Sequence, residues 1–208
     1  MREVTATFQA GRVYAIFGDN GAGKSTLLRV MCGLAHATAG NILIFGNRER
    51  SHFTARLGYM GHAPLLYDEM TGMENLLYFA GLYGISDSGH CERAIAAVGL
   101  DPALSRRAGE YSQGMRQRLS LARAAIHDPE ILLLDEPFSN LDPSSARAMA
   151  RLVGEMRDRG KTILVVTHQA AHLAEIADES LWISAGRIAA WERGIAAADR
   201  AAASVTVS

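Results

Sequence analysis

The sequence predicts an α/β fold, and two patterns support this prediction. Short apolar runs that suit buried strands recur along the chain, as VYAIFG at 13–18, ILLLDE at 131–136 and KTILVVTHQ at 161–169. Segments with helical apolar periodicity lie between these runs, including one that begins near residue 24 and one that begins near residue 143. Sheets of this class bind ligands at the carboxyl ends of their strands, so functional groups are expected at that edge.

The composition fits one compact unit or two small subdomains. The 208 residues are 49% hydrophobic and 21% charged, which argues against an intrinsically disordered chain. The 21 Lys and Arg residues nearly balance the 22 Asp and Glu residues. This balance gives no electrostatic reason to expect DNA or RNA, so we predict no nucleic-acid partner.

The cysteines and the apolar segments indicate which cellular compartment suits the chain. Cys32 and Cys91 fall in segments of helical character without metal-ligand spacing, which predicts reduced thiols, as in a cytoplasmic protein. No window approaches the roughly 20 apolar residues that span a bilayer, and MREVTATFQAGR at 1–12 lacks the pattern of a signal peptide. Any membrane role is therefore expected to come through a partner.

Two predicted strands lead into a glycine-rich loop. Residues 2–8 alternate between apolar and polar side chains, which predicts a half-exposed strand, and VYAIFG predicts a buried one. The buried strand runs into GDNGAGKST at 18–26, which matches the pattern G-x-x-x-x-G-K-[ST] and opens a periodic helix. Strand, glycine loop and helix in this order are the context that a phosphate-binding loop requires.

The residue types in this loop suit a nucleotide phosphate. Glycines let the backbone turn so that its N–H groups and the helix N-terminus face phosphate oxygens. Lys24 would reach the terminal phosphates and the Ser25 hydroxyl would ligate Mg²⁺. A tight turn between strand and helix is the weaker interpretation. The predicted nucleotide-binding residues are Gly18, Asp19, Asn20, Gly21, Ala22, Gly23, Lys24, Ser25 and Thr26.

The middle third of the chain predicts an inserted helical subdomain at about 68–127. Before it, NILIFGN at 41–47 suggests a strand and turn, and ARLGYMGH at 55–62 a buried strand that ends near His62. Thr71 and Glu74 form a plausible capping box ahead of a helix, and a second helix follows in HCERAIAAVGL. The α/β core would then comprise about 1–67 and 128–193.

Two carboxylates follow the predicted strand ILLLDE. Asp135 is placed to hold Mg²⁺ and Glu136 to polarise an attacking water, because they lie at the carboxyl end of a strand. A solvated acidic turn becomes the weaker interpretation once the phosphate loop is taken into account. Downstream, Asp142 and Pro143 predict the start of a helix that runs to about Arg159.

Histidines follow two of the predicted strands. KTILVVTHQ would deliver His168 to the same edge of the sheet, where it suits a sensor of the terminal phosphate. His62 follows the strand at 55–62; it is either a hydrogen-bonding group of the site or a tolerated polar loop residue. The Ala-rich residues 194–208 predict a flexible tail.

These motifs together resemble the ATP-binding subunit of an ABC transporter. GDNGAGKS, YSQGM at 111–115, ILLLDE, SNLD at 139–142 and the TH of 167–168 occur in the family's order and cover nearly the whole chain. The resemblance implies a P-loop NTPase (RecA-like) core with an ABC-type antiparallel β subdomain and an inserted helical subdomain. It also implies ATP hydrolysis with Mg²⁺ and docking on transmembrane permease subunits at the inner face of the cell membrane.

YSQGM departs from the family's LSGGQ signature at three positions but keeps Ser112 and Gly114. The resemblance implies that Ser112, Gln113 and Gly114 contact the ATP of the opposite subunit in a head-to-tail homodimer or heterodimer. It assigns Ser139 and Asp142 to the D-loop. Family members usually begin with a strand and an adenine-stacking aromatic residue that are not seen here, so no residue is assigned to adenine.

The resemblance makes Glu136, His168 and His62 the catalytic group, with His62 in the place of the family's Q-loop glutamine. A Gly-His pair followed by APLL, together with THQ at 167–169, is similar to the ATPases of the haem exporter in c-type cytochrome maturation. Haem is therefore the cargo hypothesis. Two alternatives remain: a soluble ABC-family regulatory ATPase, and a small-molecule kinase, which would leave YSQGM, SNLD and His168 unexplained.

Overall fold

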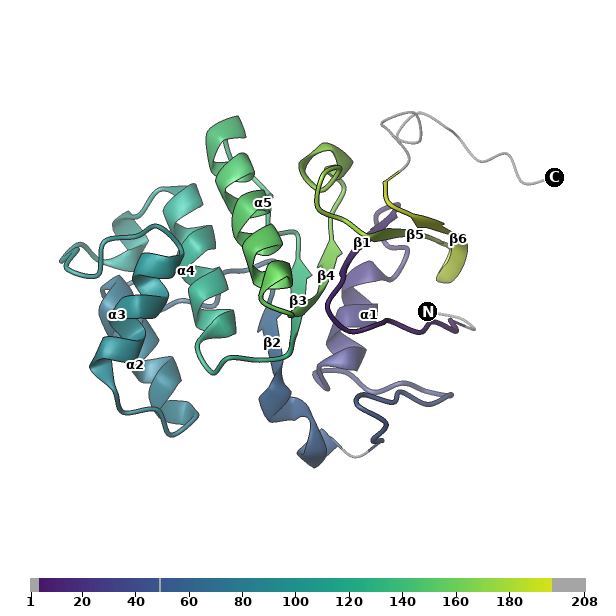
Figure 1. The fold of residues 1–208 in the computed structure, drawn as a ribbon, viewed down its shortest axis with the longest axis horizontal. Helices are drawn as coiled ribbons and strands as arrows, with labels where there is room; N and C mark the ends of the chain where they lie inside the picture. The colour runs from purple at the N-terminus through teal and green to yellow at the C-terminus, as the bar shows by residue number, and fades with distance from the viewer. Residues whose placement is uncertain (1–3, 49, 196–208) are drawn as a thin grey trace.

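A six-stranded sheet forms the centre of the computed structural model, which describes residues 4–48 and 50–195 (Figure 1). Its strand order is β2-β3-β4-β1-β5-β6; neighbours are parallel except for the antiparallel pair β5–β6. The strands are β1 (Val13–Gly18), β2 (Leu57–Met60), β3 (Ile131–Asp135), β4 (Thr162–Val166), β5 (Glu179–Ser184) and β6 (Arg187–Arg193).

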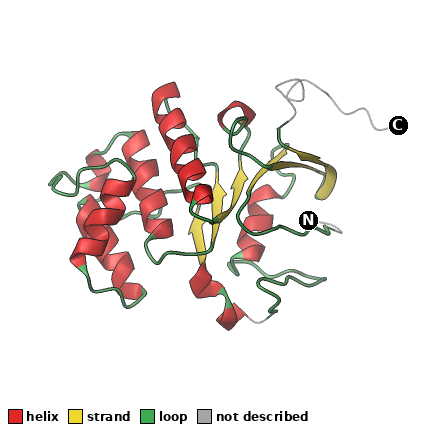
Figure 2. Ribbon diagram, viewed as in Figure 1, coloured by secondary structure: helices red, strands yellow, loops and turns green. Residues whose placement is uncertain are grey.

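Helices cover both faces of this sheet (Figure 2). Helix α1 packs on the face that carries Tyr14 and Ile16, and α4 and α5 pack on the face that carries Val13 and Ala15, because side chains alternate along β1. The helices are α1 (Lys24–Met31), α2 (Gly72–Leu82), α3 (Ser88–Ala97), α4 (Gln113–Ala125) and α5 (Pro143–Asp158), with short 3-10 turns at Arg50–His52, Thr54–Arg56, Ala108–Glu110 and Ala170–His172.

Helices α2, α3 and α4 pack together beside the β2 edge of the sheet (Figure 1). The predicted capping box begins α2: the Glu74 amide donates to the Thr71 hydroxyl, and the Thr71 amide donates to the Glu74 carboxylate. Cys91 of α3 is fully buried in the shared core, and neither it nor Cys32 forms a disulfide, as predicted.

Two predicted strands do not form in the described residues. Residues 4–8 have extended coil without a ladder partner, and Phe8 instead packs against Tyr14 and Trp191. Within 41–47 a single bridge joins Ile44 and Asn47 around a turn whose residue Phe45 has a φ of 52°. A strand pattern without a neighbouring strand gains no ladder hydrogen bonds, so the segments stay irregular. Residues 2–3 and 196–208, which hold part of the first strand and most of the predicted tail, lie outside the described residues.

Buried Asn75 fixes the loop that leads from β2 into α2. Its carboxamide oxygen accepts from the Tyr67 amide at 2.8 Å, and its nitrogen donates to the carbonyls of Tyr67 and Thr71, each at 3.0 Å. The side chain is fully buried, so it satisfies backbone groups that water does not reach. The loop after His62 therefore depends on this residue for its shape.

We expect Asn75→Ala to lower the free energy of unfolding by about 2 to 4 kcal/mol, because it leaves buried backbone groups without partners. Urea denaturation monitored by circular dichroism measures this loss. The matched control is Asn41→Ala at an exposed site, which should shift the midpoint little. Equal midpoints for the two variants would show that the Asn75 carboxamide does not hold the loop.

Candidate active site

The loop of residues 18–26 joins β1 to α1 and depends on glycine at two places. A Cβ on Gly18 would lie 2.0 Å from the carbonyl oxygen of Ile183 in β5, so a larger residue would push the two strands apart. Gly23 has a φ of 103° and precedes α1, which has neither a side-chain cap nor an acidic residue in its first turn. The first amides of α1 are therefore free to bind an anion.

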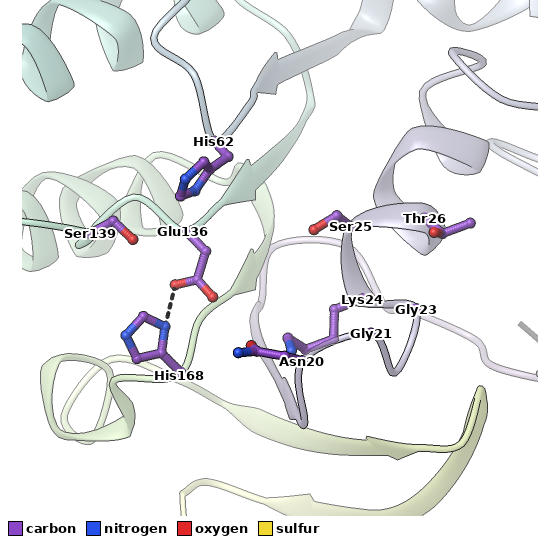
Figure 3. A pocket seen from close by; sticks show the side chains of 10 residues that line it. All are labelled: Asn20, Gly21, Gly23, Lys24, Ser25, Thr26, His62, Glu136, Ser139 and His168. Carbon is purple, nitrogen blue, oxygen red and sulfur yellow. Dashed lines mark ion pairs between the residues drawn. The ribbon is translucent and has the colours of Figure 1, made fainter.

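Lys24 lies buried inside the loop. Its ammonium group donates to the carbonyl oxygens of Gly18 at 2.7 Å and Asp19 at 2.9 Å. These contacts hold the positive charge at the wall of the pocket, between the loop and the end of the sheet (Figure 3). A polyanion that enters the pocket meets this ammonium group and the α1 amides together.

Asp135 and Ser25 form a pair that suits Mg²⁺. The Ser25 hydroxyl donates to Asp135 Oδ1 at 2.9 Å, which ties α1 to β3. Asp135 is 1% exposed, its second oxygen has no hydrogen-bond partner in the described part of the chain, and burial raises its pKa. A buried carboxylate with an unused oxygen beside a hydroxyl offers the hard oxygen ligands that Mg²⁺ prefers.

No cluster of three His, Cys, Asp or Glu side chains that could hold a metal occurs in residues 4–48 and 50–195. Mg²⁺ usually takes one or two protein ligands together with substrate phosphates and water. Ser25 and Asp135 would supply the protein's share.

Glu136 and His168 contact each other in the pocket. Glu136 follows β3 in a left-handed conformation with a φ of 56°, and its amide donates to the Val166 carbonyl at 2.8 Å. His168 follows β4, and its Nδ1 lies 3.1 Å from Glu136 Oε2 (Figure 3). Adjacent parallel strands thus bring the two side chains together, although they lie far apart in the sequence.

His62 lies in the loop after β2 and also lines the pocket. Figure 3 shows His62, Glu136 and His168 along one side of the pocket and the phosphate loop along the other. The pocket has a volume of about 360 Å³. Its lining residues are Asn20, Gly21, Gly23, Lys24, Ser25, Thr26, His62, Glu136, Ser139 and His168.

The predicted signature residues do not line this pocket. Ser112 caps α4 by accepting the Met115 amide at 3.3 Å, and Gln113 and Gly114 form the first turn of that helix. A Cβ on Gly114 would lie 2.5 Å from the Ser145 hydroxyl, so Gly114 also allows α4 and α5 to approach closely. This end of α4 has no part in the pocket of its own subunit.

The segment SNLD has one residue in the pocket and one outside it. Ser139 is buried and lines the pocket. Asp142 caps α5, and hydrogen bonds from Ser144 and Ser145 hold its pKa well below the usual range. The segment thus connects the pocket to the start of α5.

The sequence patterns gave no signal for Tyr59 and Arg29, which lie near Asp135. Burial raises the pKa of Tyr59, and a hydrogen bond from the Arg29 guanidinium opposes that rise. Arg29 also lowers the pKa of Asp135 against the larger effect of burial. A side chain that acts through space in this way has no local sequence pattern.

Comparison with known proteins agrees with this geometry. The family model described as "ABC transporter" matches residues 1–139. NatA, an ABC transporter ATP-binding protein of Bacillus subtilis, is 35% identical over 195 residues, which cover 90% of this chain and 79% of NatA. The bacitracin transport ATP-binding protein BcrA of Bacillus licheniformis is 35% identical over 182 residues, but the chain covers only 60% of BcrA and 86% of itself.

A solved structure of an ATP-binding subunit of an ABC transporter superposes with a TM-score of 0.80 at 31% identity. The match covers 91% of this chain and 82% of that one. The observed fold agrees with both comparisons. The chain therefore belongs to the ABC transporter family and is one of its ATP-binding cassettes, which are ATPases that use ATP and Mg²⁺.

Proposed function

We propose that this cassette hydrolyses ATP in the pocket between the phosphate loop and Glu136, and that hydrolysis powers export through membrane subunits. The observation that carries this proposal is convergence: the phosphate loop, the buried Asp135 and Glu136 meet at one edge of the sheet. A tight turn or an isolated acidic loop would not require a lysine, a hydroxyl and two carboxylates around one cavity.

The side chains divide the reaction among them. Lys24 and the first amides of α1 would hold the terminal phosphates, and Ser25 with Asp135 would hold Mg²⁺, which would neutralise charge on the phosphate oxygens. Glu136 orients a water and accepts its proton as the water oxygen bonds to the terminal phosphorus and the bond to ADP breaks. His168 holds the Glu136 carboxylate through the 3.1 Å contact and faces the same phosphate.

A second subunit completes the site in this proposal. The residues at the start of α4 do not line the chain's own pocket, and no acidic residue stands in the first turn of that helix. Ser112, Gln113 and Gly114 would thus bind the ATP held by the opposite subunit in a head-to-tail dimer. Ser139 and Asp142 would lie between the two nucleotides.

An exposed apolar patch supports docking on a permease. Leu65, in the loop after His62, is 52% exposed in a left-handed conformation, and Leu82, the last residue of α2, is 66% exposed. Tyr67 and Tyr78 are also exposed and contact each other edge to face at 5.0 Å. Within the described residues no helix has the length and apolar character needed to cross a membrane. We infer that this patch meets a membrane subunit at the inner face of the membrane.

The identity of the transported substrate is the most specific part of the proposal. Haem export rests on the pair Gly61–His62 and on THQ at 167–169, whereas BcrA is named for bacitracin transport. The pocket at the edge of the sheet is lined by residues of the phosphate loop and suits a nucleotide phosphate. We therefore propose export of a small molecule that the membrane subunits select, with haem as one candidate.

Glu136→Gln should lower turnover by about 10² to 10⁴-fold, because an amide cannot accept the proton of the attacking water. ATP affinity should stay close to wild type, and a closed dimer should accumulate with ATP. Phosphate release, equilibrium nucleotide binding and size-exclusion chromatography measure the three effects. Glu130→Gln, at an exposed carboxylate paired with Arg56, is the matched control and should retain turnover. Normal turnover in Glu136→Gln would refute the assignment.

Mg²⁺ affinity should fall as pH falls through the raised pKa of Asp135, because the carboxyl group must lose its proton to bind the metal. Below that pKa the half-saturating Mg²⁺ concentration should rise by up to about tenfold per pH unit. Titrations of Mg²⁺ into the Glu136→Gln variant with ATP measure it without hydrolysis. Asp135→Asn, introduced into the Glu136→Gln variant, should bind Mg²⁺ weakly and show only the pH dependence of ATP itself. Identical pH profiles of Mg²⁺ affinity with and without Asp135→Asn would show that Asp135 does not bind the metal.

Purification of tagged Glu136→Gln from gently solubilised native membranes with ATP should recover membrane subunits, which mass spectrometry identifies. Components of cytochrome c maturation among them would support haem export. Recovery of other permeases would support a transporter function and argue against haem as the transported substrate. Absence of any membrane protein would favour the soluble regulatory ATPase instead.

A further inference from the structure

Helix α4 holds the loop that carries His62 at both ends. The Ser120 hydroxyl donates to the Pro64 carbonyl at 2.9 Å, and the Arg123 guanidinium donates to the Tyr59 carbonyl at 2.9 Å. The two acceptors lie on either side of His62 in the sequence. The loop is therefore attached to α4 before and after the histidine.

Ser120 is buried, and Arg123 is half-buried with its Nε shielded from solvent, so water has limited access to these bonds. Ser120 is 0% exposed, and Arg123 lies over the Phe79 ring with its guanidinium carbon 5.4 Å from the ring centroid. Burial lowers the pKa of Arg123, and its Nε has no hydrogen-bond partner among the described residues. A buried guanidinium with few partners loses much if its bond to Tyr59 breaks.

The topology of the sheet explains why the Tyr59 carbonyl is available. Strand β2 is an edge strand, hydrogen-bonded only to β3 on one side. Its other side faces α4, where a backbone carbonyl without a ladder partner can accept from a side chain. The His62 loop is thus joined to the helical side of the molecule as well as to the sheet.

The same helix begins with Ser112, Gln113 and Gly114. An α-helix of this length moves as a rigid unit, so a displacement at its first turn also displaces Ser120 and Arg123. The loop would follow, because both of its ends are bonded to α4. The histidine in the pocket would then change position when the signature end moves.

We propose that Ser120 and Arg123 are positioning residues that make the placement of His62 depend on the position of α4. Binding of the opposite subunit's ATP at Ser112 to Gly114 thereby sets His62 for hydrolysis in the chain's own pocket. This inference rests on the proposed ATPase function. It assigns no chemistry to Ser120 or Arg123 themselves, since neither lines the pocket.

Ser120→Ala tests the proposal with little change in volume. We expect kcat for ATP to fall by about 3- to 10-fold, the loss of one hydrogen bond, with KM unchanged within about twofold. Dependence of the rate on ATP concentration should also become less cooperative. Thermal unfolding of the variant checks that the fold survives. Unchanged kcat and cooperativity would overturn the proposal.

The decisive measurement is a double-mutant cycle with His62→Ala. Ser120→Ala should have no further effect on kcat when His62 is absent, because Ser120 acts through His62. Additive effects, or a His62→Ala protein with wild-type kinetics, would overturn the proposal. In both of these outcomes the wild-type chain still hydrolyses ATP. If the proposed ATPase function itself were wrong, the wild-type chain would not hydrolyse ATP, so the two kinds of failure can be distinguished.

Arg123→Met and Arg123→Lys form a second, independent pair. Methionine keeps much of the buried stem but removes the donor, whereas lysine keeps a charge that can reach the Tyr59 carbonyl. We expect kcat to be lower in Arg123→Met than in wild type and to recover in part in Arg123→Lys. Arg151→Met on the exposed face of α5 is the control and should behave as wild type. Equal kinetics for the methionine and lysine variants would remove Arg123 from the proposal.

Discussion

The hydrogen bond between Ser25 and Asp135 is the interaction on which the rest of the site depends. It joins the first turn of α1 to the end of β3, and it is part-buried, with Asp135 only 1% exposed and Ser25 at the edge of the pocket. Desolvation makes a lone charge there costly, so the carboxylate is useful only beside a hydroxyl donor or a cation. The same pair therefore holds two elements together and is the proposed site of the protein ligands to Mg²⁺. Everything else in the pocket is placed relative to it.

Two local backbone features bring the reactive groups to this pair. The absence of a side chain at Gly18 lets β1 end close against β5, so the phosphate loop starts at the edge of the sheet. One residue past Asp135, Glu136 adopts a left-handed conformation that costs energy for a residue with a Cβ. The amide bond to Val166 secures it, and the turn directs the carboxylate toward His168. The backbone strain at Glu136 is thus associated with the direction in which its carboxylate points.

Helix α4 connects the two functional ends of the cassette. Its first turn carries the signature residues and packs closely on α5 through Gly114, and its later turns hold the loop around His62. Tyr111, where the family usually has leucine, remains buried against Gly72, so the altered signature keeps an anchored core position. The exposed patch at Leu65 and Tyr67 lies in the same loop as His62. The proposed membrane contact, the proposed signature residues and the pocket are thus connected through one helix and one loop.

The sequence by itself predicted the strand, glycine loop and helix at the phosphate loop, the strand that leads to Asp135 and Glu136, and the caps at Thr71 and Asp142, because these depend on local patterns of glycine, apolar runs and capping side chains. The alternation at residues 2–8 and the apolar run at 41–47 predicted two strands that do not form among the described residues, because a strand forms only where a neighbouring strand supplies hydrogen-bond partners. Tertiary structure alone decided that His168 meets Glu136, that His62 faces the pocket, and that Ser120 and Arg123 reach the loop around it. Those contacts join residues far apart in the chain. The pairing of β3 with β4 brings His168 to Glu136, and the packing of α4 against the edge strand β2 brings Ser120 and Arg123 to the loop around His62.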